Sequence, residues 1–106
     1  MTTYKELFSL ENRVAIVTGG TGHLGTAFSQ ILAEAGARVI ITSRKLERAE
    51  KAASLLPGQG HLPLELDHKD QDSIDGLIPA AVREYGHIDI LVNNATLGGH
   101  VTIGDY

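Results

Sequence analysis

The sequence predicts an α/β fold, a doubly wound parallel sheet with strand order 3-2-1-4 that is incomplete after the fourth strand. Two observations predict this class. Apolar, β-branched runs alternate with segments of helical period between residues 13 and 93, as in parallel strands joined by crossover helices. A glycine-rich turn follows the first apolar run. The 106 residues are the size of one domain, so we treat residues 1–106 as a single unit.

The first strand is expected at residues 14–17, a β-branched run suited to burial on both faces. The glycine-rich turn leads from it into a helix, and Gly36 is expected to cap that helix at its C-terminus. Apolar residues recur at helical spacing along this segment, which predicts an amphipathic helix. Its apolar positions are Leu24, Ala27, Phe28, Ile31, Leu32 and Ala35.

Alternation of the same kind continues to the fourth strand. The expected elements are a strand at 38–42, a helix with apolar positions from Leu46 to Leu56, a short strand at 62–66, a helix with Asp70 as N-cap and a strand at 88–92. Pro79 removes one backbone donor from the last helix, which predicts a kink near residues 75–79 or a start later than Asp70. Residues after 95 are expected to form a loop.

Composition and charge exclude several classes of function. The formal net charge is -4 and the nine Lys and Arg residues are scattered, so a nucleic-acid partner is not expected. No apolar run approaches the ~20 residues of a bilayer span, and the start does not read as a secretory signal. With no cysteine and no helix-borne histidine pair, no metal site is expected. These features predict a cytoplasmic protein with no membrane partner.

The turns after the four strands are expected to converge on one ligand site. In doubly wound sheets, ligands bind at the carboxyl ends of the strands, where the strand order reverses, here between the first and fourth strands. The turns that meet there carry the candidate cofactor-binding residues. They are Gly19, Thr21, Gly22, His23, Leu24, Gly25, Ser43, Arg44, Asp67, His68, Asn94 and Ala95.

Residues 20–25, GTGHLG, match the G-x-G-x-x-G dinucleotide pattern directly after a strand and at the start of a helix. Glycine lets backbone N–H groups approach a pyrophosphate, and the helix N-terminus adds partial positive charge. Gly25 is expected to allow close packing of the helix on the strand, and His23 to lie over the pyrophosphate. The alternatives are a glycine-rich turn without a ligand, or a site for FAD or another nucleotide.

The other three turns indicate which dinucleotide binds. At the end of the second strand, Arg44 and the Ser43 hydroxyl suit a 2′-phosphate, and no acid is present for a free ribose hydroxyl. We therefore favour NADP over NAD. The alternative is that Arg44 is a solvated residue at the start of the next helix. Asp67 is expected to accept from the adenine amine, unless it is a loop acid or a local cap. Asn94 and Ala95 are expected to flank the ribose beside the nicotinamide, while Asn93 is expected to be structural.

Several motifs in order resemble the short-chain dehydrogenase/reductase family. Residues 9–20, SLENRVAIVTGG, are similar to its opening strand, Asp67 to its adenine-site acid, and residues 86–95, GHIDILVNNA, to its fourth strand and following motif. The resemblance implies a Rossmann-type fold. It also implies an NADP-dependent oxidoreductase that reduces a small carbonyl compound or oxidises an alcohol by hydride transfer.

The chain departs from the family pattern in its glycine turn. His23 occupies the position of the middle glycine of T-G-x-x-x-G-x-G, so the turn has the T-G-x-x-G-x-x-G spacing of the longer, nucleotide-sugar-type members. That spacing leaves a fragment of a nucleotide-sugar epimerase as a third reading. The sequence Asn93-Asn94-Ala95 favours the shorter members, although Thr96 stands where they commonly have a glycine.

The resemblance places the family's catalytic asparagine, serine, tyrosine and lysine beyond Tyr106, so we expect this chain to be the cofactor-binding half. The alternative is a truncated, non-catalytic module that binds a dinucleotide, or a protein partner through its sheet edge. Strand four would be an edge with Ile88, Ile90 and Val92 facing missing neighbours. That edge predicts a homo-oligomer, or another polypeptide that completes the sheet.

Overall fold

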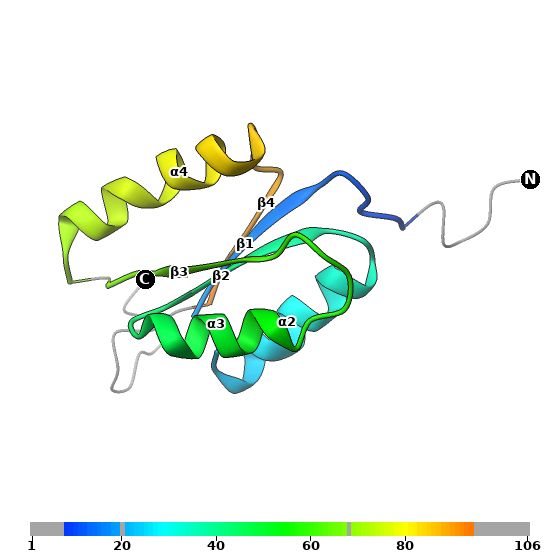
Figure 1. The fold of residues 1–106 in the computed structure, drawn as a ribbon, viewed down its shortest axis with the longest axis horizontal. Coiled ribbons are helices and arrows are strands. Elements are labelled where there is room, and N and C mark those ends of the chain that lie inside the picture. The colour runs from blue at the N-terminus through cyan, green and yellow to red at the C-terminus, as the bar shows by residue number, and fades with distance from the viewer. Residues whose placement is uncertain (1–7, 20, 68, 95–106) are drawn as a thin grey trace, which may run out of the picture.

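The computed structural model describes residues 8–19, 21–67 and 69–94, which form one parallel sheet between two helical layers (Figure 1). The strands are β1 (Val14–Thr18), β2 (Arg38–Ser43), β3 (Leu62–Glu65) and β4 (Ile90–Asn93). The helices are α2 (His23–Glu34), α3 (Leu46–Ser54) and α4 (Gln71–Tyr85). The sheet order is β3-β2-β1-β4, with every neighbouring pair parallel. The predicted doubly wound order is therefore confirmed.

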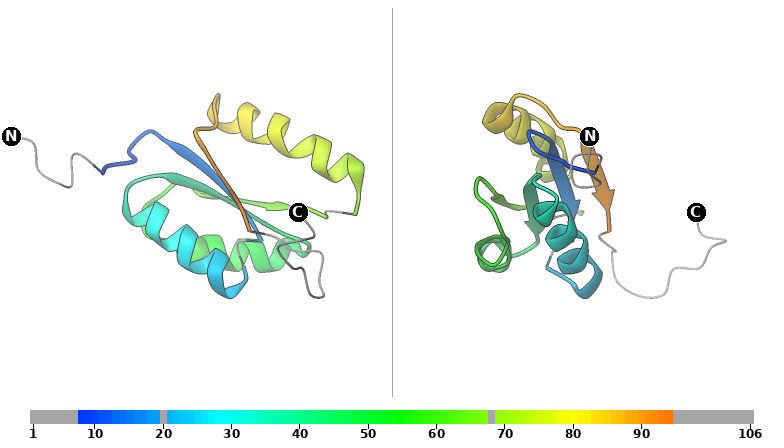
Figure 2. Two further views of the ribbon diagram at one scale, coloured as in Figure 1. Left: turned by 180° about the vertical axis from the view of Figure 1, so that it is seen from behind. Right: turned by 90° about the vertical axis from the view of Figure 1, so that its right-hand side faces the viewer.

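The core lies on both faces of β1 and β2. Helices α2 and α3 cover one face of the sheet and α4 covers the other, as the edge-on view of Figure 2 shows. Val17, Val39 and Ile41 pack under α2 and α3, whereas Ile16 and Ile40 pack under α4. All five residues of β1 are buried, so the β-branched run at residues 14–17 has the two-sided burial that its composition predicts. None of the described helices is long and apolar enough to cross a membrane.

Helix α2 buries a different face from the one that its apolar pattern predicts. The residues against the sheet are the small ones, Gly25, Ser29 and Ala33. Leu24 is 59% exposed and Ile31 is 62% exposed. Small side chains let the helix axis approach the strands closely, and the large apolar side chains then point past the sheet. The expectation that the apolar stripe forms the buried face is wrong for these residues.

Helix α4 begins where its N-cap predicts and runs through its internal proline. The Asp70 carboxylate accepts from the N–H of Asp72 at 3.0 Å, so a start later than Asp70 is excluded. Pro79 lies within the continuous span Gln71–Tyr85. Pro79 and Asp75, whose carbonyl loses its partner, are both exposed, and water can satisfy that carbonyl. Solvent exposure therefore makes the proline tolerable.

Among the described strands, β4 forms one edge of the sheet, and its exposed apolar side chain is Leu91. Ile90 and Val92 are half-buried, and Val92 packs against the cluster under α2 and α3. Leu91 lies on the α4 face beside the fully buried Ile16 and is 60% exposed. The residues expected to face missing neighbours, Ile88, Ile90 and Val92, are half-buried, and the exposed apolar residue of the strand is Leu91, because α4 covers β1 and does not reach β4. That this edge lacks a neighbour stays a prediction.

The amino ends of β1 and β4 are joined by one carboxylate. Asp89 accepts from the N–H of Val14 at 2.8 Å and lies 3.0 Å from Nε2 of His87 and 3.4 Å from a guanidinium nitrogen of Arg13. Its own N–H donates to the carbonyl of Val14 at 2.9 Å. Strand β4 is therefore anchored to β1 just before its first ladder residue, Ile90.

The glycine after α2 is required by its backbone conformation and by its surroundings. Gly36 has φ 105° and follows the last turn of the helix, as predicted for a C-terminal cap. A Cβ at this position would lie 3.0 Å from Cγ and 3.2 Å from the backbone nitrogen of Glu11. The segment before Glu11 is held in place because Leu10 donates to the carbonyl of Ala35 at 2.7 Å. Glu11 therefore has little room to move.

A pair of glycine substitutions tests this packing. Gly36→Ala should lower the free energy of unfolding by about 1–3 kcal/mol, because alanine is strained at positive φ and would contact Glu11. Gly76→Ala is the matched control, since Gly76 lies in α4 with no atom within 4 Å of an added Cβ. It should raise the free energy of unfolding by about 0.5–1 kcal/mol. Urea denaturation followed by circular dichroism measures both changes, and equal effects would contradict the structure.

The Asp89 anchor predicts a pH-dependent stability. The Val14 N–H lowers the pKa of Asp89 below its ordinary value of 3.8, with further contributions from His87 and Arg13. A depressed pKa in the folded state stabilises the fold above the ordinary value, and that stabilisation is lost as the pH falls through the folded-state value. Wild type should therefore unfold at higher urea concentration than Asp89→Asn at neutral pH. The difference in urea midpoint between the two proteins should shrink below about pH 4. A difference in midpoint that stays constant down to acid pH would show that Asp89 does not anchor the strand as a carboxylate.

Candidate functional site

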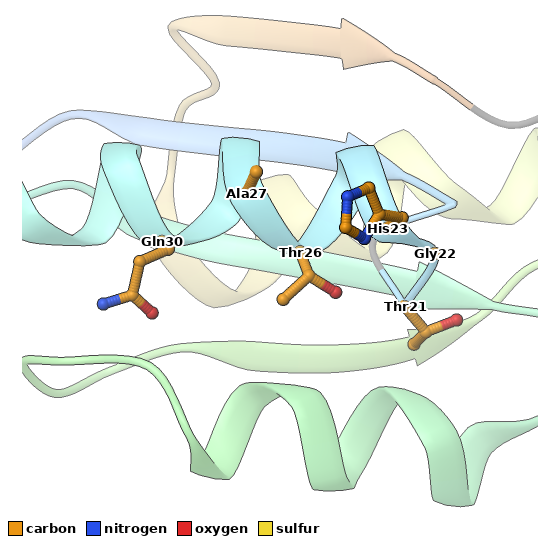
Figure 3. Close-up of a pocket in the computed structure, with 6 residues that line it drawn as sticks. All are labelled: Thr21, Gly22, His23, Thr26, Ala27 and Gln30. Carbon is orange, nitrogen blue, oxygen red and sulfur yellow. The ribbon is translucent and has the colours of Figure 1, made fainter.

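The carboxyl ends of all four strands lie at one edge of the sheet. Thr18 pairs with Asn93, and Ser43 with Glu65, so the residues that follow each strand emerge together. The turn after β1 lies between the ends of β1 and β2 and leads directly into α2, with Thr21, Gly22 and His23 at that end (Figure 3). The structure therefore brings the first, second, third and fourth turns to the same edge, as their positions after the strands predict.

Gly19 and Gly22 of the glycine turn differ in whether the backbone conformation favours glycine. Gly19 has φ 64°, in the region where glycine is favoured, and its carbonyl accepts from the N–H of Gly22 at 3.3 Å. Gly22 has φ -77°, which any residue can adopt, and a Cβ there would meet only the Gly19 carbonyl at 3.7 Å. The fold therefore does not require glycine at position 22. Its exposed backbone instead leaves space for a group that approaches the turn from solvent.

The N-terminus of α2 has neither a capping side chain nor an acid in its first turn. Gly22 is the N-cap and offers no side-chain acceptor to the first N–H groups of the helix. The other two described helices differ, since α4 is capped by Asp70 and has Asp72 in its first turn, and α3 has Glu47 in its first turn. Free N–H groups and the partial positive charge of a helix N-terminus favour an anion. Of the described helices, α2 is thus the one whose N-terminus is suited to phosphate.

A shallow, open hollow of about 570 Å³ lies beside this turn along α2 (Figure 3). It is lined by Thr21, Gly22, His23, Thr26, Ala27 and Gln30. Thr26, Ala27 and Gln30 were not among the candidate site residues predicted from the sequence. Their signal was the helical spacing of Thr26, Ala27 and Gln30 from His23, which places all four along one side of the helix. Of the predicted turn residues, His23 and Leu24 are exposed and Gly25 is buried against the sheet.

The ends of β1 and β4 are tied together by one hydroxyl. Thr18 Oγ1 lies 3.2 Å from Oδ1 of Asn93 and 3.3 Å from the carbonyl of Val92, and it accepts from the N–H of Asn94 at 3.0 Å. The Asn94 side-chain amide donates to the carbonyl of Gly19 at 3.4 Å. Asn93 thus links neighbouring strands, as expected, and Asn94 holds the end of β4 against the glycine turn. The expected contact of Asn94 with a ribose stays a prediction.

The turns after β2 and β3 present an exposed arginine and a partly used carboxylate. Ser43 Oγ accepts from the N–H of Lys45 at 3.3 Å, and its carbonyl accepts from Leu66 at 2.8 Å. Arg44 is exposed, and no other described residue bonds its guanidinium. Asp67 accepts from the N–H of Lys69 through Oδ1 at 2.9 Å, which is a local turn contact. That contact uses one carboxylate oxygen and leaves the other for a further donor.

Two predicted site residues, His68 and Ala95, lie outside the described residues. Within the described part of the chain, no group of three or more His, Cys, Asp or Glu residues is placed to hold a metal ion. The chemistry assembled at this edge is therefore that of backbone N–H groups, a helix N-terminus, hydroxyls and one arginine. Groups of these kinds suit phosphate and ribose.

Residues 13–106 match the family model described as short chain dehydrogenase. The chain is 40% identical over 88 residues to the galactitol 2-dehydrogenase of Agrobacterium fabrum, which covers 83% of this chain and 34% of that protein. It is 42% identical over 92 residues to the 2-dehydro-3-deoxy-D-gluconate 5-dehydrogenase of Escherichia coli, covering 85% of this chain and 36% of that protein. The chain thus spans about a third of the length of these relatives.

Solved structures show the same architecture. A 3-ketoacyl-(acyl-carrier-protein) reductase from Brucella melitensis, solved in complex with NADH, superposes with a TM-score of 0.78 at 36% identity. The match covers 85% of this chain and 36% of that one. A short chain dehydrogenase from Bacillus anthracis superposes with a TM-score of 0.75 at 35% identity, covering 82% of this chain and 36% of the other. The parallel sheet with alternating helices is therefore the arrangement found in these proteins.

Proposed function

The chain belongs to the short-chain dehydrogenase/reductase family, and we propose that it forms the cofactor-binding part of an NADP-dependent oxidoreductase. The reaction would be the reduction of a carbonyl group or the oxidation of an alcohol. Bound at this site, the nicotinamide would supply or accept the hydride. The role of residues 1–106 in that reaction is to bind and orient the dinucleotide.

The uncapped N-terminus of α2 is the observation that carries this proposal. It follows the carboxyl end of β1, the strand at which the order of the sheet reverses. Ligands of doubly wound sheets bind at such a point. The absence of a first-turn acid, together with the exposed backbone of Gly22, fits a pyrophosphate on the N–H groups of the turn. His23, the first residue of the helix, would lie against the same phosphates.

The preference for NADP depends on the turn after β2. Arg44 is exposed and has no partner among the described residues, and neither residue 43 nor residue 44, at the end of β2, is an acid. A guanidinium binds a 2′-phosphate through two parallel hydrogen bonds, and the Ser43 hydroxyl would add a third contact. The free oxygen of Asp67 would accept from the adenine amine. Because the Brucella melitensis neighbour was solved with NADH, the choice between the two cofactors needs a direct measurement.

The substrate would be a small alcohol or carbonyl compound, the class to which the names of the two dehydrogenase relatives belong. We expect the family's catalytic serine, tyrosine and lysine outside the described residues. A cytoplasmic location and a homo-oligomeric assembly complete the proposal. The second candidate is a non-catalytic module that binds a dinucleotide or a protein, and the position of β4 at the edge of the described sheet favours it.

Gly22→Asp tests the phosphate site without weakening the fold. Aspartate is a favourable N-cap, so the free energy of unfolding should stay equal or rise by up to about 1 kcal/mol. The new carboxylate would occupy the helix N-terminus and repel the pyrophosphate, lowering NADPH affinity by at least about tenfold. Titration calorimetry measures the affinity, and Gly22→Ala, which adds only a Cβ with a 3.7 Å contact, is the control. Undiminished affinity in Gly22→Asp would refute the proposed site.

Arg44→Ala tests the choice of cofactor. A charge-assisted hydrogen bond contributes about 1.5–3 kcal/mol, so NADPH affinity should fall by about 10–100-fold while NADH affinity changes little. Arg48→Ala is the matched control, because Arg48 is also exposed and lies four residues further on, in the first turn of α3. It should leave both affinities unchanged. An equal loss for NADPH and NADH would mean that Arg44 does not contact a 2′-phosphate.

A further inference from the structure

His61 is a half-buried histidine with a hydrogen bond at each of its two ring nitrogens. It stands in the segment that joins α3 to β3, one residue before β3 begins (Figure 1). Nδ1 of the ring accepts from the N–H of Val39 at 3.0 Å, and Nε2 lies 2.7 Å from the carbonyl oxygen of Pro57. The ring therefore ties the end of the α3–β3 segment both to its own beginning and to strand β2.

These two contacts are compatible with only one protonation state of the ring. A backbone N–H can only donate, so the Nδ1 atom that faces Val39 must carry a lone pair. A carbonyl oxygen can only accept, so the Nε2 atom that faces Pro57 must carry the hydrogen. The ring is thus neutral, with its hydrogen on Nε2. A protonated ring carries hydrogens on both nitrogens, and its Nδ1–H would point at the N–H of Val39.

The N–H of Val39 depends on this ring for its acceptor. Arg38, one residue earlier, donates its N–H to the carbonyl of Arg13 at 3.0 Å, on the β1 side. Successive N–H groups of an inner strand point to opposite neighbours, so the N–H of Val39 points toward β3. The paired residues of β2 and β3 begin only at Ile40 and Leu62. Because Val39 is 0% exposed, loss of the ring acceptor would leave a buried donor without a partner.

The surroundings of His61 do not favour a positive charge on its ring. In the described part of the chain, no carboxylate lies within ion-pair distance of His61. Arg38 of β2 stands beside the same segment, since a Cβ on Gly60 would lie 3.4 Å from Nε of Arg38. The side chains of α3 that pack with Val39 are apolar. They are Ala49, Ala52, Ala53 and Leu56.

A second group, Tyr85 of α4, holds the segment in a way that does not change with the charge of His61. Its hydroxyl donates to the carbonyl of Gly60, and its ring centroid lies 5.8 Å from the guanidinium carbon of Arg38. Burial raises the pKa of Tyr85 above its ordinary value of 10.0, with a further contribution from Glu84 and an opposing one from Arg38. The hydroxyl therefore remains a donor over the whole range in which a histidine changes its charge.

We propose that His61 is a pH-sensitive latch, which in its neutral form holds the α3–β3 segment against β2 and in its protonated form releases the N–H of Val39. Histidine changes its charge between about pH 5 and 8, so the latch would open on mild acidification. Tyr85 keeps the segment attached at Gly60, so the opening is local. The latch lies at the amino ends of β2 and β3, opposite the edge with the proposed cofactor site, and does not depend on that proposal.

Hydrogen exchange of the Val39 amide, followed by NMR on the 106-residue chain, tests the latch. The protection of this amide, measured relative to an unstructured chain at the same pH, should fall at least about tenfold between about pH 7.5 and 5.5. In His61→Asn the side-chain oxygen takes the place of Nδ1 and has no charge to gain. This variant should keep the Val39 amide protected at both pH values.

His87→Asn is the matched control. Nε2 of His87 faces two acceptors, the carbonyl of Asn12 at 3.0 Å and the carboxylate of Asp89 at 3.0 Å, and a protonated ring can still donate to both. This variant should therefore leave the pH response of the Val39 amide unchanged. The amide of Asp89, which donates to the carbonyl of Val14 at 2.9 Å, should stay protected in every protein at both pH values.

Three results would overturn the proposal. The first is equal protection of the Val39 amide at both pH values in wild type. The second is an equal loss of protection in His61→Asn, and the third is a parallel loss at the Asp89 amide, which would mean that the whole fold opens. If His61→Asn does not fold, nitrogen NMR of the wild-type ring is still decisive. Nδ1 of His61 should carry no hydrogen at neutral pH, and a hydrogen found there would refute the latch.

Discussion

The burial of β1 on both faces is the constraint on which the rest of the structure depends. Every residue of β1 is buried, so the chain must supply a helical layer on each side and a strand on each edge. The strands β2 and β4 meet the second requirement, and α2 and α4 meet the first. The same arrangement brings the end of β1 to the point where the sheet order reverses. The position of the glycine turn, and so of the proposed phosphate site, follows from the burial of one five-residue strand.

Much of this fold could be predicted from the sequence, because continuous β-branched runs and helical spacing are strong local signals. The strand order, the Asp70 cap and the Gly36 terminus follow from such signals and agree with the structure. The buried face of α2 could not be predicted in that way. Hydrophobic spacing identifies which residues share a face, but the distance between a helix and a sheet decides whether large or small side chains fit beneath it. Gly25, Ser29 and Ala33 fit there.

For the candidate site, the sequence identified the turns but not the contacts within them. Asn94 was expected beside a ribose, and in the structure its amide bonds the Gly19 carbonyl. Asp67 uses one oxygen in a local turn. Such contacts join residues that are far apart in the sequence, or depend on the path of a loop, and neither property leaves a periodic pattern. The hollow along α2 could not be predicted either. Thr26 and Gln30 line it because their side of the helix is not covered by another element.

The fastening of β4 at both of its ends affects how a ligand would meet the glycine turn. Asp89 holds the beginning of the strand to Val14, and the Thr18 hydroxyl holds its end through Asn94. The backbone between these points is therefore held against β1 in the absence of a ligand. Ordering a flexible segment opposes association, and a rigid one avoids that entropic cost. A dinucleotide at the glycine turn would meet an Asn94 that Thr18 and Gly19 already hold in place, so that little ordering on association would fall to this end of β4.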